Sequence, residues 1–236
     1  MGEREVVVVI GGGSGIGEAT AAMFSSRGAE VLIIGRDGAK LEAAAKRIGS
    51  VSCEAADARD GARLKEIFTK RGRFQHLVLC LSGGRGGGPF RTLSLDDLRS
   101  GIEGKLLAHL SALQAALPFV TQSVTFVSAA SARAALPGTA GLAAINGAIE
   151  AMVRPLAAEL APLRVNAVSP GIIDTPWWNA VPAQARTAAF ENTAKSLPVG
   201  RVGKPQDVAS AIVWVATNGY VTGTVVDVSG GATLAR

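Results

Sequence analysis

Short apolar runs alternate with helix-forming segments along the chain. The first run, Val6–Ile10, is an unbroken stretch of β-branched residues, which is typical of a strand buried on both faces of a parallel sheet. The glycine-rich stretch Gly11–Gly17 follows it, and the helix-forming residues Glu18–Phe24 come next. A second apolar run, Glu30–Arg36, predicts another strand and completes a strand–helix–strand unit.

The same alternation continues to the end of the chain. Further strands are expected at Val51–Ala55, Phe74–Leu81, Ser123–Ser128, Arg164–Val168 and Gly223–Val228, and further helices at Asp37–Ile48, Gly61–Lys70, Ser94–Leu117, Ala140–Leu160 and Pro205–Ala216. Seven strands with helices between them predict an α/β fold, a doubly wound Rossmann-type parallel sheet with helices on both faces. We expect a single domain over residues 1–236, with an irregular helical lid around residues 175–196. Pro155 should kink its helix or remove a hydrogen bond, at about 3 kcal/mol.

The glycines at Gly11–Gly17 indicate a phosphate site. Glycine lets the backbone turn sharply and approach a ligand closely, at φ angles that other residues resist. A helix that begins there directs free N–H groups and the positive end of its dipole at the ligand. A tight turn without any ligand gives the same pattern, but the second strand arrives about 20 residues later, as dinucleotide binding requires.

Composition excludes several other classes of protein. Hydrophobic residues make up 48% of the chain and charged residues 18%, which suits a globular protein with a buried sheet. The net charge of +5 is modest and the basic residues are scattered, so we expect no nucleic-acid partner. Cys53 and Cys80 lie in strand-like stretches and are expected to be reduced thiols, with no metal site. No apolar stretch reaches the ~18 residues of a membrane helix and no signal peptide precedes the first strand, so we expect a cytoplasmic protein.

Four segments resemble the short-chain dehydrogenase/reductase family, in the family's order and over nearly the whole chain. They are Gly11–Gly17, Arg164–Thr175, Leu197–Val208 and Val221–Gly231. The resemblance implies a nicotinamide dinucleotide cofactor, a small-molecule substrate and assembly into a homodimer or homotetramer. The alanine-rich segment Ala140–Leu160 fits close helix packing between subunits.

The resemblance also implies which residues bind the cofactor. They are Gly11, Gly13, Ser14, Gly15, Ile16 and Gly17 at the phosphates, Asp57 beside the adenine, Ser82 and Gly83 after the fourth strand, and Pro170, Gly171, Ile172 and Thr175 at the nicotinamide carboxamide. Relatives usually carry Asn-Asn-Ala-Gly after the fourth strand. Here Cys80–Gly83 keeps only the glycine and a small residue, so the bracing by asparagine is lost.

Arg36 indicates NADP(H) rather than NAD(H). Relatives that prefer NAD have an acidic residue at the end of the second strand, where this chain has Gly35 followed by Arg36. A guanidinium can make two charge-assisted hydrogen bonds to the 2′-phosphate of the ribose, and no carboxylate at Gly35 repels that phosphate. The alternative is a solvent-exposed arginine at a strand end.

The positions of the family's four catalytic residues hold other side chains. Relatives use a tyrosine as acid–base, a lysine four residues later, a serine that polarises the substrate carbonyl and an asparagine on the preceding helix. By the resemblance these positions are Leu142, Asn146, Ala129 and Lys105. The only tyrosine, Tyr220, falls where relatives have no catalytic role. Loss of acid–base help lowers a rate by about 10²- to 10⁴-fold.

Lys105 and Ser131 remain as candidate catalytic residues. A desolvated lysine beside a cationic nicotinamide has a lowered pKa, so it can serve as an acid or form an imine. The alternative is an exposed lysine, or one paired with Glu103 or a neighbouring carboxylate. Ser131 and Arg133 lie just past the Ala129 position, where they either contact substrate or belong to an ordinary loop.

One histidine and two tryptophans each have two possible roles. His109 lies four residues after Lys105 on the same helical face, and we expect a packed or subunit-contact histidine rather than a catalyst. Trp177 and Trp178 fall in the lid, where they line an aromatic substrate pocket or pack the lid against the body.

Three functions are compatible with this sequence. The first is an NADP(H)-dependent oxidoreductase with altered catalysis, acting on a carbonyl, activated alkene, imine or quinone. The second is an inactive protein that binds NADP(H) as a sensor or structural ligand. The third is a lyase or isomerase that uses Lys105. The intact cofactor segments and lid favour the first.

Overall fold

Seven parallel strands form one sheet in the computed structural model, which describes residues 4–234. The strands are β1 (Val6–Ile10), β2 (Glu30–Gly35), β3 (Val51–Ala55), β4 (Phe74–Leu79), β5 (Val120–Val127), β6 (Arg164–Pro170) and β7 (Val225–Val228). Their order across the sheet is β3-β2-β1-β4-β5-β6-β7, which confirms the doubly wound α/β fold. The chain changes direction across the sheet between β1 and β4, and ligands of open α/β sheets bind beyond the strand ends at such a point.

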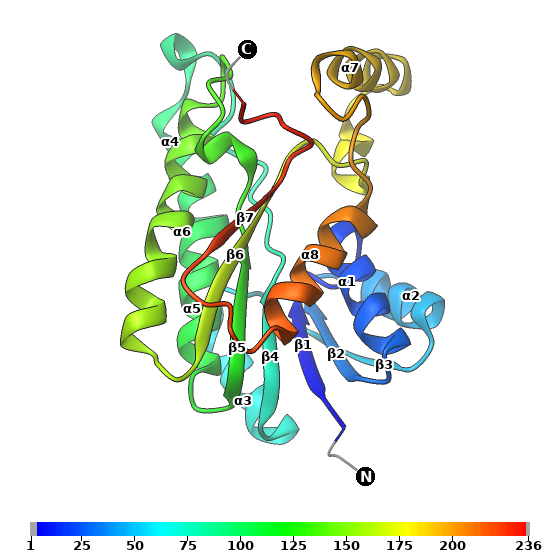
Figure 1. Cartoon of the computed structure of the whole chain (residues 1–236), viewed down its shortest axis with the longest axis vertical. Helices are drawn as coiled ribbons and strands as arrows, with labels where there is room; N and C mark the ends of the chain where they lie inside the picture. Colours follow the sequence, from blue (N-terminus) through cyan, green and yellow to red (C-terminus); the bar gives the residue numbers. More distant parts are fainter. Residues whose placement is uncertain (1–3, 235–236) are drawn as a thin grey trace.

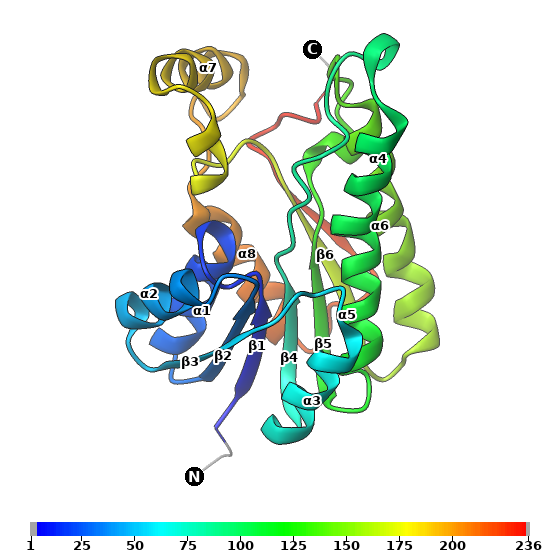
Figure 2. The ribbon, with the colours of Figure 1, turned by 180° about the vertical axis from the view of Figure 1, so that it is seen from behind.

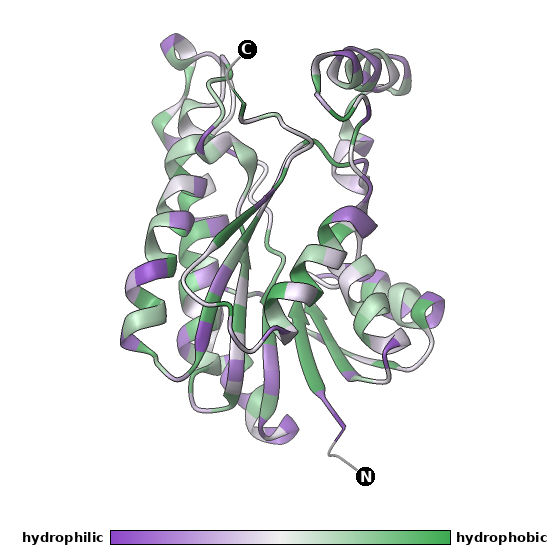
Figure 3. Ribbon diagram, in the orientation of Figure 1, coloured by the Kyte–Doolittle hydropathy of each residue, from purple (hydrophilic) through white to green (hydrophobic). Residues whose placement is uncertain are grey.

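Helices cover both faces of the sheet (Figures 1 and 2). One layer holds α1 (Gly15–Ser26), α2 (Gly38–Ile48) and α8 (Pro205–Thr217), and the other holds α3 (Gly61–Arg71), α5 (Ala108–Ala116) and α6 (Ala140–Glu159). Strand β1 is buried on both sides because Val7 and Val9 pack into one layer, whereas Val8 and Ile10 pack into the other. Figure 3 accordingly shows β1 and β2 as apolar along their lengths.

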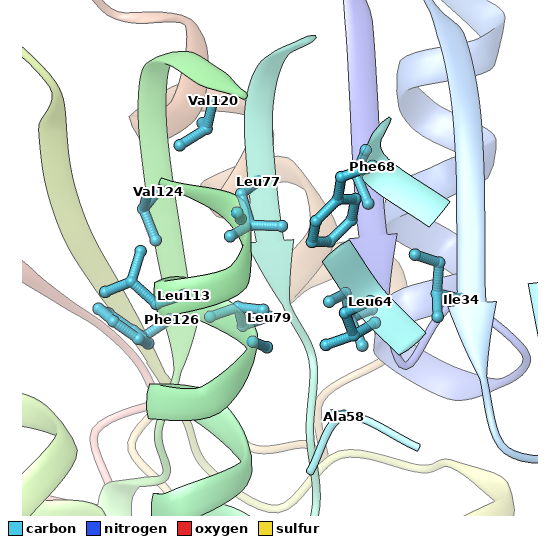
Figure 4. Packing of buried hydrophobic residues seen from close by; sticks show 14 of the residues in the cluster. Ile34, Ala58, Leu64, Phe68, Leu77, Leu79, Leu113, Val120, Val124 and Phe126 are labelled. Atoms are coloured by element: carbon cyan, nitrogen blue, oxygen red, sulfur yellow. The ribbon is translucent and has the colours of Figure 1, made fainter. Parts of the chain in front are cut away.

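The larger core lies between the sheet and the α3–α5–α6 layer (Figure 4). Phe68 of α3 packs against Phe74 of β4 with ring centroids 5.4 Å apart, and Leu77 is fully buried beside them. Burying each such side chain stabilises the fold by about 1.5–3 kcal/mol. This core holds the strand ends in register, so that Ile10 pairs with both Ile34 and Leu79 at the edge that carries the site.

The helical region predicted over Ser94–Leu117 is confirmed, because residues 95–116 are helical without a break. The structure divides this run into α4 (Leu95–Gly101), a π-helical segment η2 (Ile102–Leu107) and α5. Gly101, just before η2, lies against another loop, since a Cβ on it would lie 2.7 Å from Arg85 O. Segments of π-helix often occur at functional sites, and this one carries Lys105.

Several other boundaries differ from the predictions. Strand β4 ends at Leu79 rather than Leu81, β7 begins at Val225 rather than Gly223, and β5 already begins at Val120. Helix α6 remains one helix through Pro155. Pro155 lies on its exposed face, so the carbonyl that loses its partner is open to water.

Residues 175–196 form two short helical pieces beyond the sheet. They are η4 (Pro176–Ala180) and α7 (Ala183–Ser196), while η1 (Phe90–Thr92) and η3 (Ala130–Ala132) lie in other loops. No residue of α7 is buried, and Figure 1 shows this helix standing away from the two layers. Trp178 joins it to η4 by packing edge-on against Phe190, with centroids 5.4 Å apart. Within residues 4–234, no helix is both long and apolar enough to cross a membrane.

Candidate functional site

A cleft of about 1880 Å³ runs along the carboxyl ends of the strands. Its walls include Ile10, Gly35, Cys80, Val127 and Pro170, which lie at or just after the ends of five different strands. A pocket for a drug-sized ligand has roughly 300–1,000 Å³. This cleft is therefore large enough for an extended ligand together with a second, smaller molecule.

The residues predicted from the sequence to form the site all line this cleft. They are Gly11, Gly13, Ser14, Gly15, Ile16, Gly17, Arg36, Asp57, Ser82, Gly83, Lys105, Ser131, Pro170, Gly171, Ile172 and Thr175. The fold thus brings together segments that lie up to 160 residues apart in the chain, as expected for strand ends at one edge of a parallel sheet.

The turn after β1 requires glycine. Gly11 has a φ of +87°, and a Cβ there would lie 2.3 Å from Cys80 O. A Cβ on Gly17 would lie 2.1 Å from Gly11 O, so α1 and the turn touch through bare backbone. Ser14 makes no capping hydrogen bond to α1, which leaves the first N–H groups of the helix open to an anion. These features fit a phosphate group.

Charges beside this turn are arranged to receive an anion. Glu18 in the first turn of α1 is neutralised by Arg47, whose Nε lies 2.7 Å from Glu18 Oε1. Asp37 caps α2 by accepting a hydrogen bond from Lys40 N at 3.1 Å, and this bond holds the pKa of Asp37 below its usual range. Arg36 is exposed and forms no ion pair with any residue of the described chain, so its guanidinium is available to a ligand.

Asp57 lines the same cleft as Arg36. Arg59 holds it through its guanidinium, with Nη2 2.7 Å from Asp57 Oδ2, and this bond lowers the pKa of Asp57. The aspartate is therefore a fixed acceptor that stays ionised at neutral pH. The pairing of Asp57 with Arg59 was not predicted from the sequence, although the two residues are only two positions apart.

The segment that follows β6 forms another part of the wall of the cleft. A Cβ on Gly171 would lie 2.8 Å from Ser229 Cα, so this backbone passes directly against the strand β7 segment. Thr175 packs against Gly15. A Cβ atom added to Gly15 would lie 3.3 Å from Thr175 Cβ. The segment Pro170–Thr175 consequently lies close to the glycine turn.

The two residues that the family resemblance aligns with the catalytic tyrosine and serine have side chains without acid–base chemistry. Leu142 and Ala129 both line the cleft and can neither donate nor accept a proton through their side chains. Tyr220 is fully exposed and does not line the cleft. No tyrosine is thus available in the cleft to act as the acid.

Lys105 is buried, and the alternatives of an exposed lysine or one paired with Glu103 are wrong. Its Nζ donates to Asn146 Oδ1 at 2.7 Å and to Ser128 O at 3.1 Å. Burial lowers the pKa of Lys105 to about 8, while the negative charge of Glu150 acts in the opposite direction. The close approach of the Gly83 backbone, where a Cβ would lie 3.2 Å from Lys105 Cβ, helps to enclose the lysine.

Asn146 connects Lys105 to Ser131. Its Nδ2 donates to Ser131 Oγ at 3.1 Å and to Leu142 O at 2.9 Å. Sequence reasoning identified the two ends of this connection but treated Asn146 only as a missing lysine. The available signal was that the family resemblance aligns Lys105 with an asparagine and Asn146 with a lysine.

Glu150 is a partly buried carboxylate that the sequence reading missed. It lies one turn beyond Asn146 on α6, and it accepts hydrogen bonds from Ser128 Oγ at 2.8 Å and Ser169 Oγ at 2.7 Å. Arg133 completes the cluster, with Nε 3.1 Å from Glu150 Oε2. The spacing of four residues from Asn146 on one helix face was the available signal.

Two further groups near Lys105 are held in their neutral forms. His109 is buried, with Nδ1 2.7 Å from Lys105 O, and burial together with the charge of Lys105 lowers the pKa of His109 to about 4. Burial raises the pKa of the Cys80 thiol to about 12, so it is not a thiolate nucleophile at neutral pH. Both cysteines are free thiols, as predicted.

The segment η4 contributes an aromatic wall to the cleft. Trp177 and Trp178 both line the cleft and pack edge to face, with centroids 4.8 Å apart. Trp178 Nε1 donates to Ile173 O at 3.1 Å, which fixes this ring against the segment after β6. In residues 4–234, no group of three or more His, Cys, Asp or Glu side chains is arranged to hold a metal ion.

Comparison with known proteins places this architecture in a family. The profile of the family described as Enoyl-(Acyl carrier protein) reductase matches residues 11–233. The chain is 31% identical to the 3-oxoacyl-[acyl-carrier-protein] reductase FabG of Thermotoga maritima, over 97% of this chain and 98% of the relative. It is 32% identical to the L-fucose dehydrogenase of Bos taurus, over 99% of this chain and 92% of the relative.

Solved structures agree with this placement. A small-chain dehydrogenase in complex with NADPH is 32% identical, with a TM-score of 0.86 over 99% of this chain and all (100%) of the other. The MalC Reductase/Diels-Alderase of Malbranchea aurantiaca is 25% identical, with a TM-score of 0.89 over 98% of this chain and 97% of the other. The chain belongs to the short-chain dehydrogenase/reductase family of oxidoreductases.

Proposed function

We propose that the protein is an NADP(H)-dependent oxidoreductase that works without a tyrosine acid. The observation that carries this proposal is the shared cleft, which joins an anion-binding turn at one end to Lys105 and Ser131 at the other. The similarity to a small-chain dehydrogenase in complex with NADPH supports the same cofactor class.

Each part of the cofactor has a matching group in the cleft. The open N–H groups at the start of α1 bind the pyrophosphate, and Asp57 contacts the adenine end. Arg36 binds the 2′-phosphate, since it is exposed and Asp37 beside it is engaged in capping α2. Pro170, Gly171, Ile172 and Thr175 hold the carboxamide. When bound, the nicotinamide supplies or accepts a hydride.

The remaining chemistry falls to Lys105 and Ser131. The buried ammonium of Lys105 favours negative charge that develops in the cleft, where the low dielectric strengthens its effect. The missing tyrosine suits a substrate that needs a hydride but little help from an acid. We therefore propose a carbonyl compound, activated alkene, imine or quinone as the substrate.

The test is turnover of NADPH with representatives of these four substrate classes, alongside NADPH binding measured by calorimetry. Oxidation of NADPH with reduction of at least one class is the expected result. Failure of NADPH to bind contradicts the proposal altogether. Activity that needs no NADPH and disappears in Lys105→Met would instead identify a lyase or isomerase.

A second candidate function has one observation in its favour. Leu142 gives the cleft no proton donor at the position where relatives carry their acid. A protein that binds NADP(H) tightly as a sensor or structural ligand has no need of one. Tight binding without reduction of any substrate class favours this alternative.

We also infer that the protein forms a homodimer or homotetramer. Large apolar side chains remain exposed in the single chain, including Trp214 at 49% and Phe90 at 73%. Light scattering at micromolar concentration should give two or four times the chain mass of 24.0 kDa. A monomer contradicts the inference.

A further inference from the structure

The charged side chains that line the cleft are divided unevenly between the two halves of the sheet, β1–β3 and β4–β7 (Figure 1). Within residues 4–234, the acidic residues of the lining all follow β1, β2 or β3, and they are Glu18, Asp37 and Asp57. Each of them forms an ion pair with a basic residue of the same half. The part of the lining that follows β4–β7 has only basic charged residues, and they are Arg85, Lys105 and Arg133.

The acidic partners of the two arginines do not line the cleft. Arg133 Nε lies 3.1 Å from Glu150 Oε2, and its Nη2 lies 3.8 Å from Asp227 Oδ2. Arg85 Nη1 lies 2.9 Å from Asp97 Oδ1. None of these three carboxylates belongs to the wall of the cleft, so a ligand there meets the guanidinium groups and not the acids. A cleft lined by one sign of charge attracts ligands of the opposite sign.

Arg133 is held more firmly than Arg85. Its guanidinium is fixed by acids from two elements, α6 and β7, whereas Arg85 has one acidic partner. Its side chain is 41% exposed, against 68% for Arg85. Among the described residues, no ion pair or hydrogen bond engages Arg133 Nη1, so this end of the guanidinium is available to a ligand. A guanidinium that is fixed in this way presents its N–H groups in the fork geometry that matches a carboxylate.

The carboxylates that fix Arg133 are themselves held in place. Glu150 accepts hydrogen bonds from the hydroxyls of two serines, and Asp227 accepts one from Thr233 Oγ1. The cluster therefore sets the position of the guanidinium before any ligand arrives, which lowers the entropy cost of binding.

Arg133 also lies close to the candidate catalytic residue Ser131. The segment η3 contains Ser131 and ends directly before Arg133. Residues 134–136, which follow, also line the cleft with apolar side chains. An anion bound at Arg133 thus keeps the rest of a small ligand in the half of the cleft that contains Ser131.

We propose that the substrate is a carbonyl compound that also carries a carboxylate, and that Arg133 binds this carboxylate. The inference rests on the oxidoreductase proposed above and names its substrate class, an oxo acid. Glu150 and Asp227 are positioning residues for the guanidinium. Arg85 adds positive charge to the same half of the cleft without contacting the carboxylate.

The test is calorimetric titration of the protein, saturated with NADP⁺, with 4-acetylbenzoate and with 4-acetylbenzamide. These two ketones have nearly the same shape and differ in charge. The acid should bind about 10- to 100-fold more tightly than the amide, as expected for a charge-assisted bidentate contact. Added salt should reduce this preference, because it screens the half-exposed guanidinium. Saturation with NADP⁺ keeps the acid from binding at Arg36.

Four variants locate the contact. Arg133→Gln should abolish the preference for the acid. Arg133→Lys should weaken binding of the acid and leave that of the amide unchanged, because an ammonium lacks the fork of donors. Arg85→Gln should retain most of the preference. Arg201→Gln is the matched control, since Arg201 also pairs with an acid, Asp207 at 2.7 Å, but does not line the cleft, and it should retain the preference in full. Thermal unfolding shows which variants are folded, and Arg133→Lys decides if Arg133→Gln is not.

Three results overturn the proposal. They are equal affinity of the wild type for acid and amide, no binding of the acid, and a preference for the acid that Arg133→Gln and Arg133→Lys leave unchanged. The readout needs no hydride transfer. A protein that binds the acid through Arg133 but never reduces it with NADPH refutes the proposed oxidoreductase and leaves the carboxylate site standing. If NADP⁺ does not bind, the same titrations of the free protein still test Arg133.

Discussion

Lys105 Nζ lies 2.7 Å from Asn146 Oδ1. The lysine belongs to η2 and the asparagine to α6, so the hydrogen bond joins two helical segments beside the cleft. It holds a buried amine at the wall of the cleft, which no tyrosine of the described chain lines.

Lys105→Met should change how stability depends on pH. The folded protein releases the proton of Lys105 at a pKa of about 8, whereas the unfolded chain holds it up to the ordinary value of 10.5. The unfolded chain binds more protons between these values, so the free energy of unfolding attributable to Lys105 rises with pH by about 3 kcal/mol. Denaturant unfolding of wild type and Lys105→Met from pH 7 to 10.5 measures the difference. A constant difference across this range contradicts the buried lysine.

Arg36→Ala should weaken NADPH binding by about 10- to 100-fold, because a charge-assisted bidentate contact contributes roughly 1.5–3 kcal/mol. Binding of NADH, which lacks the 2′-phosphate, should change little. Calorimetric titration with both cofactors at one ionic strength gives the comparison, since salt screens the exposed guanidinium. Lys40→Ala is a matched control, as Lys40 also lines the cleft but is already paired with Asp37 at 3.5 Å. Equal losses for NADPH and NADH in Arg36→Ala refute the assignment of the 2′-phosphate.

Gly17→Ala should abolish cofactor binding and destabilise the fold. The added Cβ would lie 2.1 Å from Gly11 O, and neither backbone segment is a flexible side chain that can move away. Overpacking of this kind typically costs about 1–3 kcal/mol. Gly219→Ala is the control, because Gly219 is exposed with open space around its Cβ position, and its effect should stay within about 0.5 kcal/mol. Thermal unfolding and NADPH titration of both variants measure these effects. Equal stability and equal NADPH affinity in the two variants contradict the prediction.

His109 should make the protein less stable in acid. Its pKa is about 4 in the folded protein and 6.5 in the unfolded chain, so the unfolded chain binds more protons between these values. Stability attributable to His109 therefore falls by about 3 kcal/mol as pH decreases from 6.5 to 4. The pKa of His76 is also lowered by burial, so the comparison with His109→Gln is needed to isolate His109. The glutamine variant should lose less stability over this range, and an identical pH dependence of both proteins would falsify the assignment.

The sequence was sufficient to predict the sheet and the composition of the cleft. Buried parallel strands appear as unbroken apolar runs, and β1 shows why, since alternate valines face opposite helix layers. The glycine turn was also predictable, because a close backbone contact such as that of Gly11 with Cys80 O leaves no room for a side chain.

The environment of Lys105 could not be predicted in this way. Lys105 is buried in the π-helical segment η2, and segments distant in the chain enclose it, such as Gly83, where a Cβ would lie 3.2 Å from Lys105 Cβ. Such a contact joins segments that no periodicity relates. The same holds for Glu150, whose partners Ser128 and Ser169 come from two different strand ends. Local sequence predicts elements, whereas the polar contacts between elements depend on how those elements pack.

We propose that a hydride is transferred in this cleft although no tyrosine lines it. Single-turnover transfer of deuterium from NADPH, labelled at C4 of the nicotinamide, to an aromatic carbonyl compound tests this proposal. We predict labelled product in the wild type and in Tyr220→Phe, since Tyr220 is fully exposed, and a loss of about 100-fold in Ser131→Ala, as for removal of an oxyanion-stabilising donor. Tight binding of NADPH with no deuterium in any product contradicts the claim.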